Sequence, residues 1–430
     1  MRHRLRIGRF GALAGVILLA QCALGLSGGI ASASTSPLIV GELLPMSGSE
    51  SYVGQWYDHG IQAGIWEVNS HGGVLGHRLV STLQDTGGDP VDAVTAYRTL
   101  LLHSPDYIVG PSSLEIMGVI NLFQKQHVVD LMEGGTTQLD RMRYSYVYRT
   151  FPSDSAQLAA EAYYALHELG CRRASLVYTS AANTQAEVAP ITSAFGSNGG
   201  TVVDVESLQP GQSSYLAEVS RTFAPHPQCV FFDADPQTTA TFMDNVRQLG
   251  HMNVHFIGGD TGASLQMAEA MGLSSASRWL TGLTTPPVFS QSYREFARAY
   301  EAEWHTRAIL PAAPAMYDAI ILASLAMVAA HSTNPHIWVH DLTLVSNPPG
   351  VPVYTYAQGV ALLRRGVKIN YQGASGPEDF NRFHNVFAGF EIVRFNADGT
   401  GLRSIANVTA SDVASMYARR SSGTGSSFAQ

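Results

Sequence analysis

Small polar residues recur just beyond short apolar runs in the first third of the chain. Each run has the length and composition of a buried strand, and the polar residues come where a helix would begin. Their hydroxyl and backbone N–H groups suit a carboxylate, because the start of a helix attracts anions. Serine and threonine at such positions also cap helices that bind nothing, so both interpretations are open. The residues are Ser47, Gly48, Ser49, Ser112, Ser113, Gly134, Gly135, Thr136 and Thr137.

Acidic residues take the corresponding positions in the middle of the chain. They end the apolar runs 229–235 and 254–260, and Asn183 and Thr184 follow a third run at 174–180. An ammonium group would pair with Asp260 while a carboxylate met the loops of the first third, so both charges of a zwitterion would find partners. The alternative is that Asp260 only caps the next helix. The other acids of this group are Asp233 and Asp235.

Catalytic signatures are missing from the sequence after residue 33. A GxSxG string occurs only at 25–29, and the chain lacks a phosphate-binding GxxxxGK[ST] motif and a GxGxxG motif after the first expected strand. His167-Glu168 begins like a zinc-protease helix, but Cys171 stands where the second histidine ligand is required. We therefore expect no catalytic residue, no metal site and no cofactor.

The elements that must position these residues follow a regular alternation. From Pro37 onward, short apolar runs alternate with longer amphipathic stretches, which predicts parallel sheets covered by helices on both faces. A helical region at 293–330 and hairpin-like strands within 367–408 follow. The fold class is α/β, with two doubly wound parallel-sheet lobes. The expected strands are 38–45, 77–85, 107–111 and 128–135 in the first lobe, then 174–180, 201–208, 229–235 and 254–260 in the second.

The first 33 residues have the pattern of an export signal. Arginines precede an apolar run from about residue 10 to residue 26, and 31–33 forms an A-x-A site. The run is shorter than the roughly 20 residues that span a membrane, and no later segment qualifies. Cys22 lies in a sequence like a lipoprotein cleavage site, although Gln21 before it is not small. We expect an exported protein, periplasmic or at the cell surface, with a lipid anchor on Cys22 left open.

Charge and cysteine content fit export. Four of the 26 Lys and Arg residues lie in the signal, which leaves 22 basic against 34 acidic side chains and a formal charge of −12. This charge disfavours nucleic-acid binding. If Cys22 leaves with the signal, Cys171 and Cys229 remain, and an oxidising compartment favours a disulfide between them.

A set of motifs in a fixed order makes the chain resemble the periplasmic leucine/isoleucine/valine-binding proteins and their relatives for amino acids, amides and urea. The resemblance covers nearly everything after residue 37, and its N-terminal part is the most specific. The matching residues are Pro45-Met46-Ser47-Gly48, Gly54, 67–76 and Asp85, then Gly110-Pro111-Ser112-Ser113, 148–157, Tyr317-Asp318-Ala319, Gly373-Ala374-Ser375-Gly376-Pro377 and Phe380.

The resemblance implies two lobes that close on a ligand about a hinge of three crossings, near 149–153, 284–289 and 348–376. Lobe 1 would comprise 37–149 and 288–347, and lobe 2 would comprise 150–287 and 348–415. A signal peptide at 1–33 and a disordered tail at 416–430 complete the expected division. The protein would act as a monomer.

The resemblance also implies the ligand-binding residues. Hydroxyl loops of lobe 1 would hold the ligand's carboxylate and amino group, and Asp260 would bind its ammonium group. At three positions where leucine-type binders have aromatic residues, this chain has other types, so its pocket is more polar. The serine loop is one residue shorter than the usual GPxSS pattern, so its hydroxyl role falls to either serine. The expected residues are Ser112, Ser113, Thr136, Thr137, Asp260, Val53, Asn183 and Asp235.

Three functions are compatible with these patterns. The leading one is the solute-binding component of an ABC importer, which delivers an amino acid or similar small polar solute to a permease and ATPase in the membrane. The second is a sensor of the same fold that signals to a receptor or regulator. The third is a secreted enzyme that uses Asp233, Asp235 or Asp260 as acid and base. Finding turnover of the bound solute would favour the enzyme, and neighbouring permease and ATPase genes would favour the importer.

Overall fold

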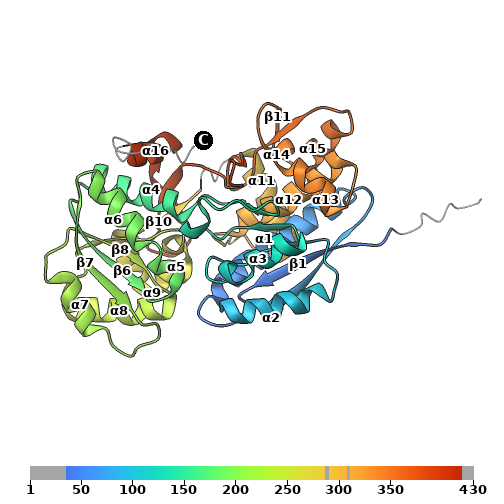
Figure 1. Ribbon diagram of the computed structural model, residues 1–430. Helices are drawn as coiled ribbons and strands as arrows, with labels where there is room; N and C mark the ends of the chain where they lie inside the picture. Colours follow the sequence, from blue (N-terminus) through green and yellow to red (C-terminus); the bar gives the residue numbers. More distant parts are fainter. Residues whose placement is uncertain (1–34, 286–289, 308–309, 419–430) are drawn as a thin grey trace, which may run out of the picture. The chain divides into compact units, whose positions relative to one another are not determined.

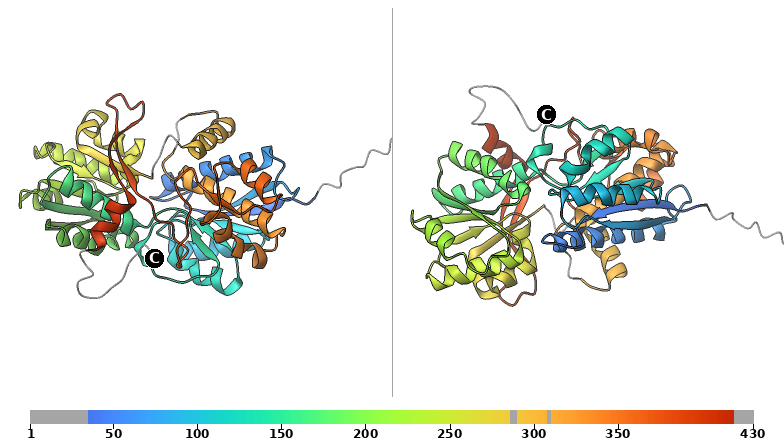
Figure 2. Two further views of the ribbon diagram at one scale, coloured as in Figure 1. Left: turned by 90° about the horizontal axis from the view of Figure 1, so that it is seen from above. Right: turned by 60° about the horizontal axis from the view of Figure 1, so that its bottom comes forward.

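The computed structural model describes residues 35–285, 290–307 and 310–418 (Figure 1). The expected signal peptide with Cys22, and the part of the expected tail after residue 418, lie outside the described residues. The described strands form a five-stranded, a seven-stranded and a two-stranded sheet. The two larger sheets carry helices on both faces, which is the predicted α/β architecture of two doubly wound lobes (Figure 2).

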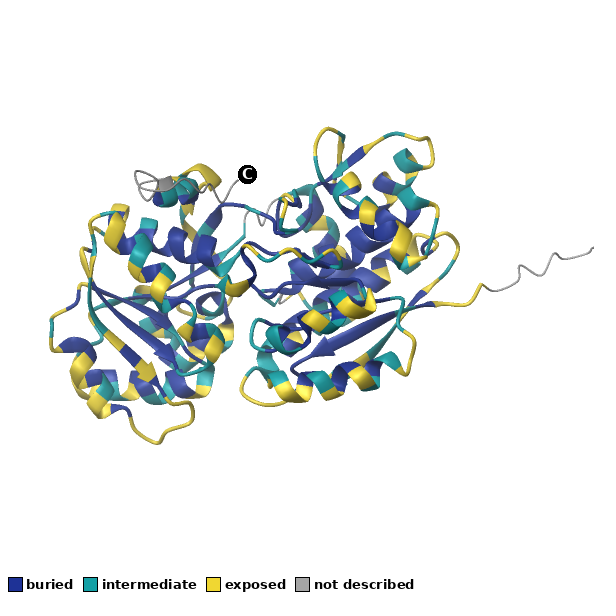
Figure 3. Cartoon of the chain, in the orientation of Figure 1, coloured by how far each residue is buried: buried dark blue, intermediate teal, exposed yellow. Residues whose placement is uncertain are grey.

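The first lobe is built on parallel strands in the order β2-β1-β3-β4-β5. Successive strand residues point to opposite faces. Leu43 and Ile108 therefore pack with helices α2 and α3, whereas Val40 and Val109 pack with α1 and α12. Burial on both faces explains why these strands read as continuous apolar runs (Figure 3). The elements are β1 Leu38–Leu44, α1 Ser51–Ser70, β2 Leu79–Asp85, α2 Pro90–Leu101, β3 Tyr107–Val109, α3 Ile116–Gln126, β4 Asp130–Met132, β5 Val147–Arg149, α11 Gln291–Trp304 and α12 Ala313–Ala330.

The second lobe has the strand order β14-β13-β10-β9-β8-β6-β7, in which β13 alone runs in the opposite direction and pairs antiparallel with both β10 and β14. Leu176 and Phe231 pack with α4, α6 and α16, and Val177 and Val230 pack with α7 to α10 on the other face. The elements are α4 Asp154–His167, β6 Arg173–Thr179, α5 Ala182–Gln185, α6 Val188–Ser197, β7 Thr201–Leu208, α7 Leu216–Phe223, β8 Cys229–Asp233, α8 Pro236–Gln248, β9 His255–Ile257, α9 Leu265–Met271, α10 Leu273–Trp279, β10 Leu280–Thr284, β13 Phe390–Phe395, β14 Leu402–Val408 and α16 Ala410–Ala418.

All eight expected strands are present, most of them shorter than the apolar run that predicted them. The expected hairpin is confirmed as β13 and β14, and the helical region as α11 and α12. Strands β5 and β10 were not predicted. In the expected tail, residues up to 418 belong to helix α16.

The expectation that no segment after the signal is long and apolar enough to span a membrane is wrong for helix α12. Among the described helices, it is long and apolar enough to cross a membrane, although the sequence was expected to hold no such segment after the signal. Its residues from Ala315 to Val328 are all buried, and it packs along α1 in the centre of the first lobe. The helix is apolar on most of its surface, Asp318 and Ser324 apart, as expected for a helix enclosed by protein.

The segment after residue 348 differs from the expected division of the chain. Strands β11 (Val351–Val353) and β12 (Ile369–Tyr371) pair with each other, and helix α15 (Tyr356–Leu363) lies between them in sequence. Their buried side chains belong to the same apolar cluster as α1 and α12, and this cluster extends to Val386. Residues 351–386 therefore pack with the first lobe, not the second, because α12 and α14 (Leu342–Ser346) cover their apolar side chains.

The crossings between lobes follow from these packing assignments. The first lies between β5 and α4, as expected, and the second lies between β10 and α11, where 286–289 are outside the described residues. The third comes after Val386 and before β13, later than the expected 348–376. The segments that lead into the first and third crossings lie side by side: the N–H of Arg149 donates to the carbonyl of His384 at 2.9 Å, and Arg149 forms a β-bridge with Asn385.

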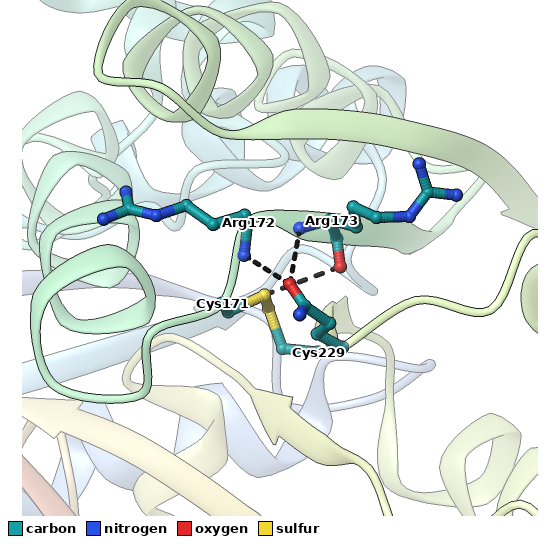
Figure 4. The surroundings of a disulfide bond; sticks show 5 residues. Cys171, Arg172, Arg173 and Cys229 are labelled. Atoms are coloured by element: carbon teal, nitrogen blue, oxygen red, sulfur yellow. Dashed lines mark hydrogen bonds between the residues drawn. A yellow bond between two sulfur atoms is a disulfide. The ribbon is translucent and has the colours of Figure 1, made fainter.

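A disulfide joins Cys171 to Cys229 in the structure (Figure 4). Cys229 begins β8 and Cys171 precedes β6, and these two strands are neighbours in the second sheet. The Cα atoms are 6.2 Å apart, within the usual range for a disulfide. Next to it, the side-chain oxygen of Gln228 accepts the N–H groups of Arg172 and Arg173, which ties the two strand starts together.

Candidate ligand-binding site

The N-terminal motif fixes the loop that leads into helix α1. The Oδ1 atom of Asp85 accepts the N–H groups of Met46 and Ser47 at 2.9 and 3.1 Å, which holds the loop after β1 against the end of β2. Gly54 lies so close to Pro45 that a Cβ atom there would come within 2.3 Å of the Pro45 carbonyl oxygen. The motif thus sets where α1 begins, and the first two turns of α1 carry side chains into the cavity described next.

A cavity of about 110 Å³ is lined by loops and helix starts from both lobes. Its walls include the aromatic side chains of Tyr52, Trp56, Tyr57, Tyr178 and Phe232. Eight carboxyl groups also line it, and no Lys, Arg or His is among the described residues that do so. From the first lobe come Glu50 and Glu133, and from the second lobe come Asp154, Glu161, Glu187, Asp233, Asp235 and Asp260.

Glu50 precedes α1 and connects the two lobes. Its Oε2 accepts the hydroxyl of Ser112 at 2.8 Å, and its Oε1 accepts the side-chain amide of Asn183 at 3.2 Å. Burial raises the pKa of Glu50 to about 7, and the carboxyls of Glu115 and Asp233 add to the rise. The carboxyl group of Glu50 therefore occupies the hydroxyl loop that the sequence assigned to a ligand's carboxylate.

The Ser112 loop is satisfied by the protein itself. The backbone N–H of Ser112 donates to Glu115 at 2.9 Å, and its hydroxyl contacts the same oxygen. The hydroxyl oxygen of Ser113 accepts the N–H of Thr136 at 3.1 Å. Thr136 is fully buried, and the hydroxyl of Thr137 donates to a backbone carbonyl of the second lobe at 3.3 Å.

The acids at the edge of the second sheet both cap helices and face the cavity. Asp235 begins α8, where its Oδ1 accepts the N–H of Thr238 at 2.9 Å, and Asp260 accepts the N–H of Thr261 at 2.8 Å. Asp233 accepts the Thr261 hydroxyl at 3.1 Å. Burial raises the pKa of Asp233 to about 6, and Asp260 raises it further by repulsion. Capping and cavity lining therefore coexist at Asp235 and Asp260.

The remaining acids lie deeper. Burial raises the pKa values of Glu133, Asp154, Glu161 and Glu187 well above the ordinary range, and repulsion among the cavity acids adds to each. Asp154 fits there because position 135 is glycine: a Cβ atom on Gly135 would lie 1.9 Å from the Asp154 carboxylate.

The nearest buried cation serves the scaffold. The guanidinium of Arg149 donates to Asp140 at 3.0 Å and to the carbonyl oxygens of Gly135 and Thr136 at 2.8 and 3.1 Å. It is buried and does not line the cavity. Its charge lowers the pKa of Glu133 only in part, because burial and repulsion outweigh it.

Most of the residues expected from the sequence come together here. Six of them line the cavity, namely Ser112, Ser113, Val53, Asn183, Asp235 and Asp260, whereas Thr136 and Thr137 do not. Their part in ligand binding stays a prediction.

Several lining residues were not anticipated, although the sequence carries a signal for some of them. Glu133 directly follows β4, as the other sheet-edge residues follow their strands. Asp154, Gln157 and Glu161 recur at helical spacing, so they share one face of α4. Glu50 has no comparable signal, because its place depends on how the loop before α1 folds.

Two doubly wound lobes with a polar cavity at the strand ends of both sheets define a solute-binding protein of the type I fold. The chain belongs to the periplasmic binding protein family, whose model matches residues 37–400, and within it to the leucine/isoleucine/valine-binding type. The family's proteins are exported solute-binding proteins, which implies a place outside the cytoplasm for this chain.

Relatives and solved structures support the family assignment. The chain is 26% identical over 387 residues to the chemotactic signal transduction system substrate-binding protein BasB of Halobacterium salinarum, covering 86% of this chain and 89% of that protein. It is 24% identical over 260 residues to the Leu/Ile/Val-binding protein BraC3 of Rhizobium johnstonii, covering 59% and 68%. The structure of the leucine-binding protein LivK of Thermotoga maritima shares the fold, with a TM-score of 0.72, 18% identity and coverage of 86% and 98%.

Proposed function

We propose that this protein is the extracytoplasmic solute-binding component of an ABC importer, which captures a small, amino-acid-sized solute bearing an ammonium group and delivers it to a membrane permease and ATPase. The observation that carries the proposal is the cavity, whose lining comes from both lobes and includes carboxyl groups from each. An ammonium group offsets such carboxylates and supplies the hydrogen-bond donors they accept.

Closure of the lobes would report occupancy. Glu50 from the first lobe already contacts Asn183 from the second, so a ligand beside this pair would touch both lobes at once. A solute that binds both lobes favours the closed form, because only that form makes all of the contacts. The permease would then recognise the closed form.

Binding is tested by thermal unfolding of protein that has been unfolded and refolded to strip bound solute. A solute at 100 times its dissociation constant should add about 2.7 kcal/mol to the free energy of unfolding. We expect such a shift from at least one small amine or amino acid. If no small solute with an ammonium group raises the unfolding temperature, the proposed function is wrong.

A sensor function is the second candidate, favoured by the name of the chemotactic relative from Halobacterium salinarum. Both functions need the same binding site, so binding assays do not separate them. Deleting the gene does: loss of solute uptake with normal movement toward the solute supports the importer, and the reverse supports the sensor. Turnover of the bound solute by the purified protein would instead support an enzyme.

A further inference from the structure

Acidic and basic side chains are far from balanced in number around the cavity. Its lining holds eight carboxyl groups and, among the described residues, no basic side chain. Arg149, the closest buried cation that the acids sense, is engaged by Asp140 and two carbonyl oxygens. Buried charges without partners are costly, so the cavity gains most from a ligand that brings positive charge. A zwitterion does not supply it, because its carboxylate cancels its ammonium.

Glu50 also takes the place where a ligand's carboxylate would be held. It accepts the Ser112 hydroxyl and the Asn183 amide, which are donors from the two lobes. A ligand carboxylate in the same loop would have to displace Glu50 or lie beside it and be repelled. The protein thus supplies its own anion at this position.

Unpartnered acceptors point the same way. Within the described chain, the Oε1 atom of Gln157 and the hydroxyl of Tyr178 have no hydrogen-bond partner, although these side chains are only 6% and 1% exposed and both line the cavity. One side-chain oxygen each of Asn183 and Asp235 is also buried without a partner. The amide and carboxylate oxygens can only accept, so the groups they lack are donors, whereas the Tyr178 hydroxyl can either donate or accept. An ammonium group carries three N–H donors and a guanidinium five.

The cavity favours an organic cation over a metal ion. Across the described ranges, no group of three or more His, Cys, Asp or Glu residues is arranged to hold a metal. The walls include Tyr52, Trp56, Tyr57 and Phe232, whose rings pack against methylene groups and attract cations. A flexible chain of methylene groups between two cationic ends matches both kinds of lining.

We propose that the ligand is an organic dication or polycation without a carboxylate, of the aliphatic diamine or polyamine class, and that Glu50 fills the position of the missing ligand carboxylate. This inference rests on the proposed function, because it names the solute that the same cavity takes. Asp233 and Asp260 would bind one cationic end, and Glu50 would be within the reach of another.

The test is isothermal titration of the refolded protein with matched probes. These are 1,4-diaminobutane, spermidine, the neutral analogue 1,4-butanediol, L-lysine, L-arginine and L-leucine. We expect a diamine or triamine to bind, the diol and leucine to give no heat, and the two basic amino acids to bind at least tenfold more weakly than the best amine. If lysine or arginine binds more strongly than the best amine, the proposal that the ligand lacks a carboxylate is wrong.

Variants connect the result to the site. Glu50→Gln keeps the shape and should weaken amine binding at least tenfold, and Asp233→Asn serves as a second variant if Glu50→Gln does not fold. Asp398→Asn, in an exposed turn away from the cavity, should bind as the parent does. Unchanged amine binding in the folded cavity variant would overturn the assignment of the site.

Failure of this inference differs from failure of the proposed function. If leucine or another neutral amino acid binds and the amines do not, the cation proposal is wrong while solute binding stands. If neither the amines nor any of the common amino acids bind, both proposals fall.

Discussion

Asp318 in helix α12 and the acids that line the cavity differ in how many hydrogen-bond donors they meet. Asp318 of α12 accepts four hydrogen bonds, from the Tyr371 hydroxyl at 2.6 Å, the N–H groups of Ala374 and Ser375 at 2.8 and 2.7 Å, and the Ser375 hydroxyl at 2.6 Å. In the cavity, by contrast, one carboxylate oxygen of Asp235 is buried without a partner, and so are the side-chain amide oxygens of Gln157 and Asn183 beside the acids. Burial raises pKa values in both places, so a raised pKa does not distinguish structure from function. What separates Asp318 from the cavity acids is the supply of donors.

The largest expected effect comes from removing the Asp318 carboxylate, whose hydrogen bonds are satisfied. Asp318→Ala should lower the free energy of unfolding by about 3 kcal/mol, because the Tyr371 hydroxyl and the N–H groups of Ala374 and Ser375 lose their acceptor in a buried site. Urea unfolding measures the loss. Asp398→Ala, in an exposed turn, is the control and should change stability by less than about 0.5 kcal/mol. If Asp318→Ala lowers the free energy of unfolding by less than about 1 kcal/mol, Asp318 does not have this structural role.

The next effect concerns the pH dependence of solute affinity. Burial raises the pKa of Glu50 to about 7 and that of Asp233 to about 6, so both are largely protonated at pH 5 and ionised at pH 8. A cation needs the ionised forms. Amine affinity should therefore rise at least ~10-fold from pH 5 to pH 8. Titration at both pH values, in a buffer of constant ionic strength, checks this, and an affinity independent of pH would contradict it.

A smaller effect concerns how the titration of Glu50 changes the stability of the protein with pH. Its raised pKa means that the folded, empty protein binds more protons than the unfolded chain between about pH 4.5 and 7. Its contribution to stability is therefore present below pH 4.5 and is lost as pH rises toward 7. The groups around it are Ser112, Asn183, Glu115 and Asp233.

Glu50→Gln removes this proton-linked loss. The variant should match the parent at pH 4 and exceed its free energy of unfolding by about 1 kcal/mol at pH 8, a value reduced because Glu50 is partly exposed. Thermal or urea unfolding at the two pH values measures the difference. A variant that is less stable than the parent at pH 8 would place Glu50 with Asp318, among the satisfied acids.

Much of this fold is legible in the sequence because it rests on local patterns. Apolar runs predicted the long strands β1, β6 and β7, whose residues are buried or alternate in a regular way. Three-residue strands such as β5 leave too short a pattern. The lobe that receives 351–386 was not predictable, because apolar residues there fit either core and only the contact with α12 decides.

The site was predictable where residues follow strands and unpredictable where loops decide. Asp233, Asp235 and Asp260 end predicted strands, so the sheet edge brings them together. The sequence also predicted the Ser112–Ser113 loop as part of the site, but it did not predict Glu50 as the acceptor of the Ser112 hydroxyl. Nothing local marks Glu50 as the acceptor of Ser112, since the two are 62 residues apart and meet only after folding.

The disulfide has a mechanical consequence. Both of its cysteines lie in the second lobe, in or beside neighbouring strands of one sheet, so this disulfide does not link the two lobes (Figure 4). In the proposed function, the disulfide would therefore stabilise the second lobe without restricting its movement against the first. Reduction of this disulfide would therefore lower the stability of the second lobe. It would not by itself favour the open or the closed arrangement of the lobes.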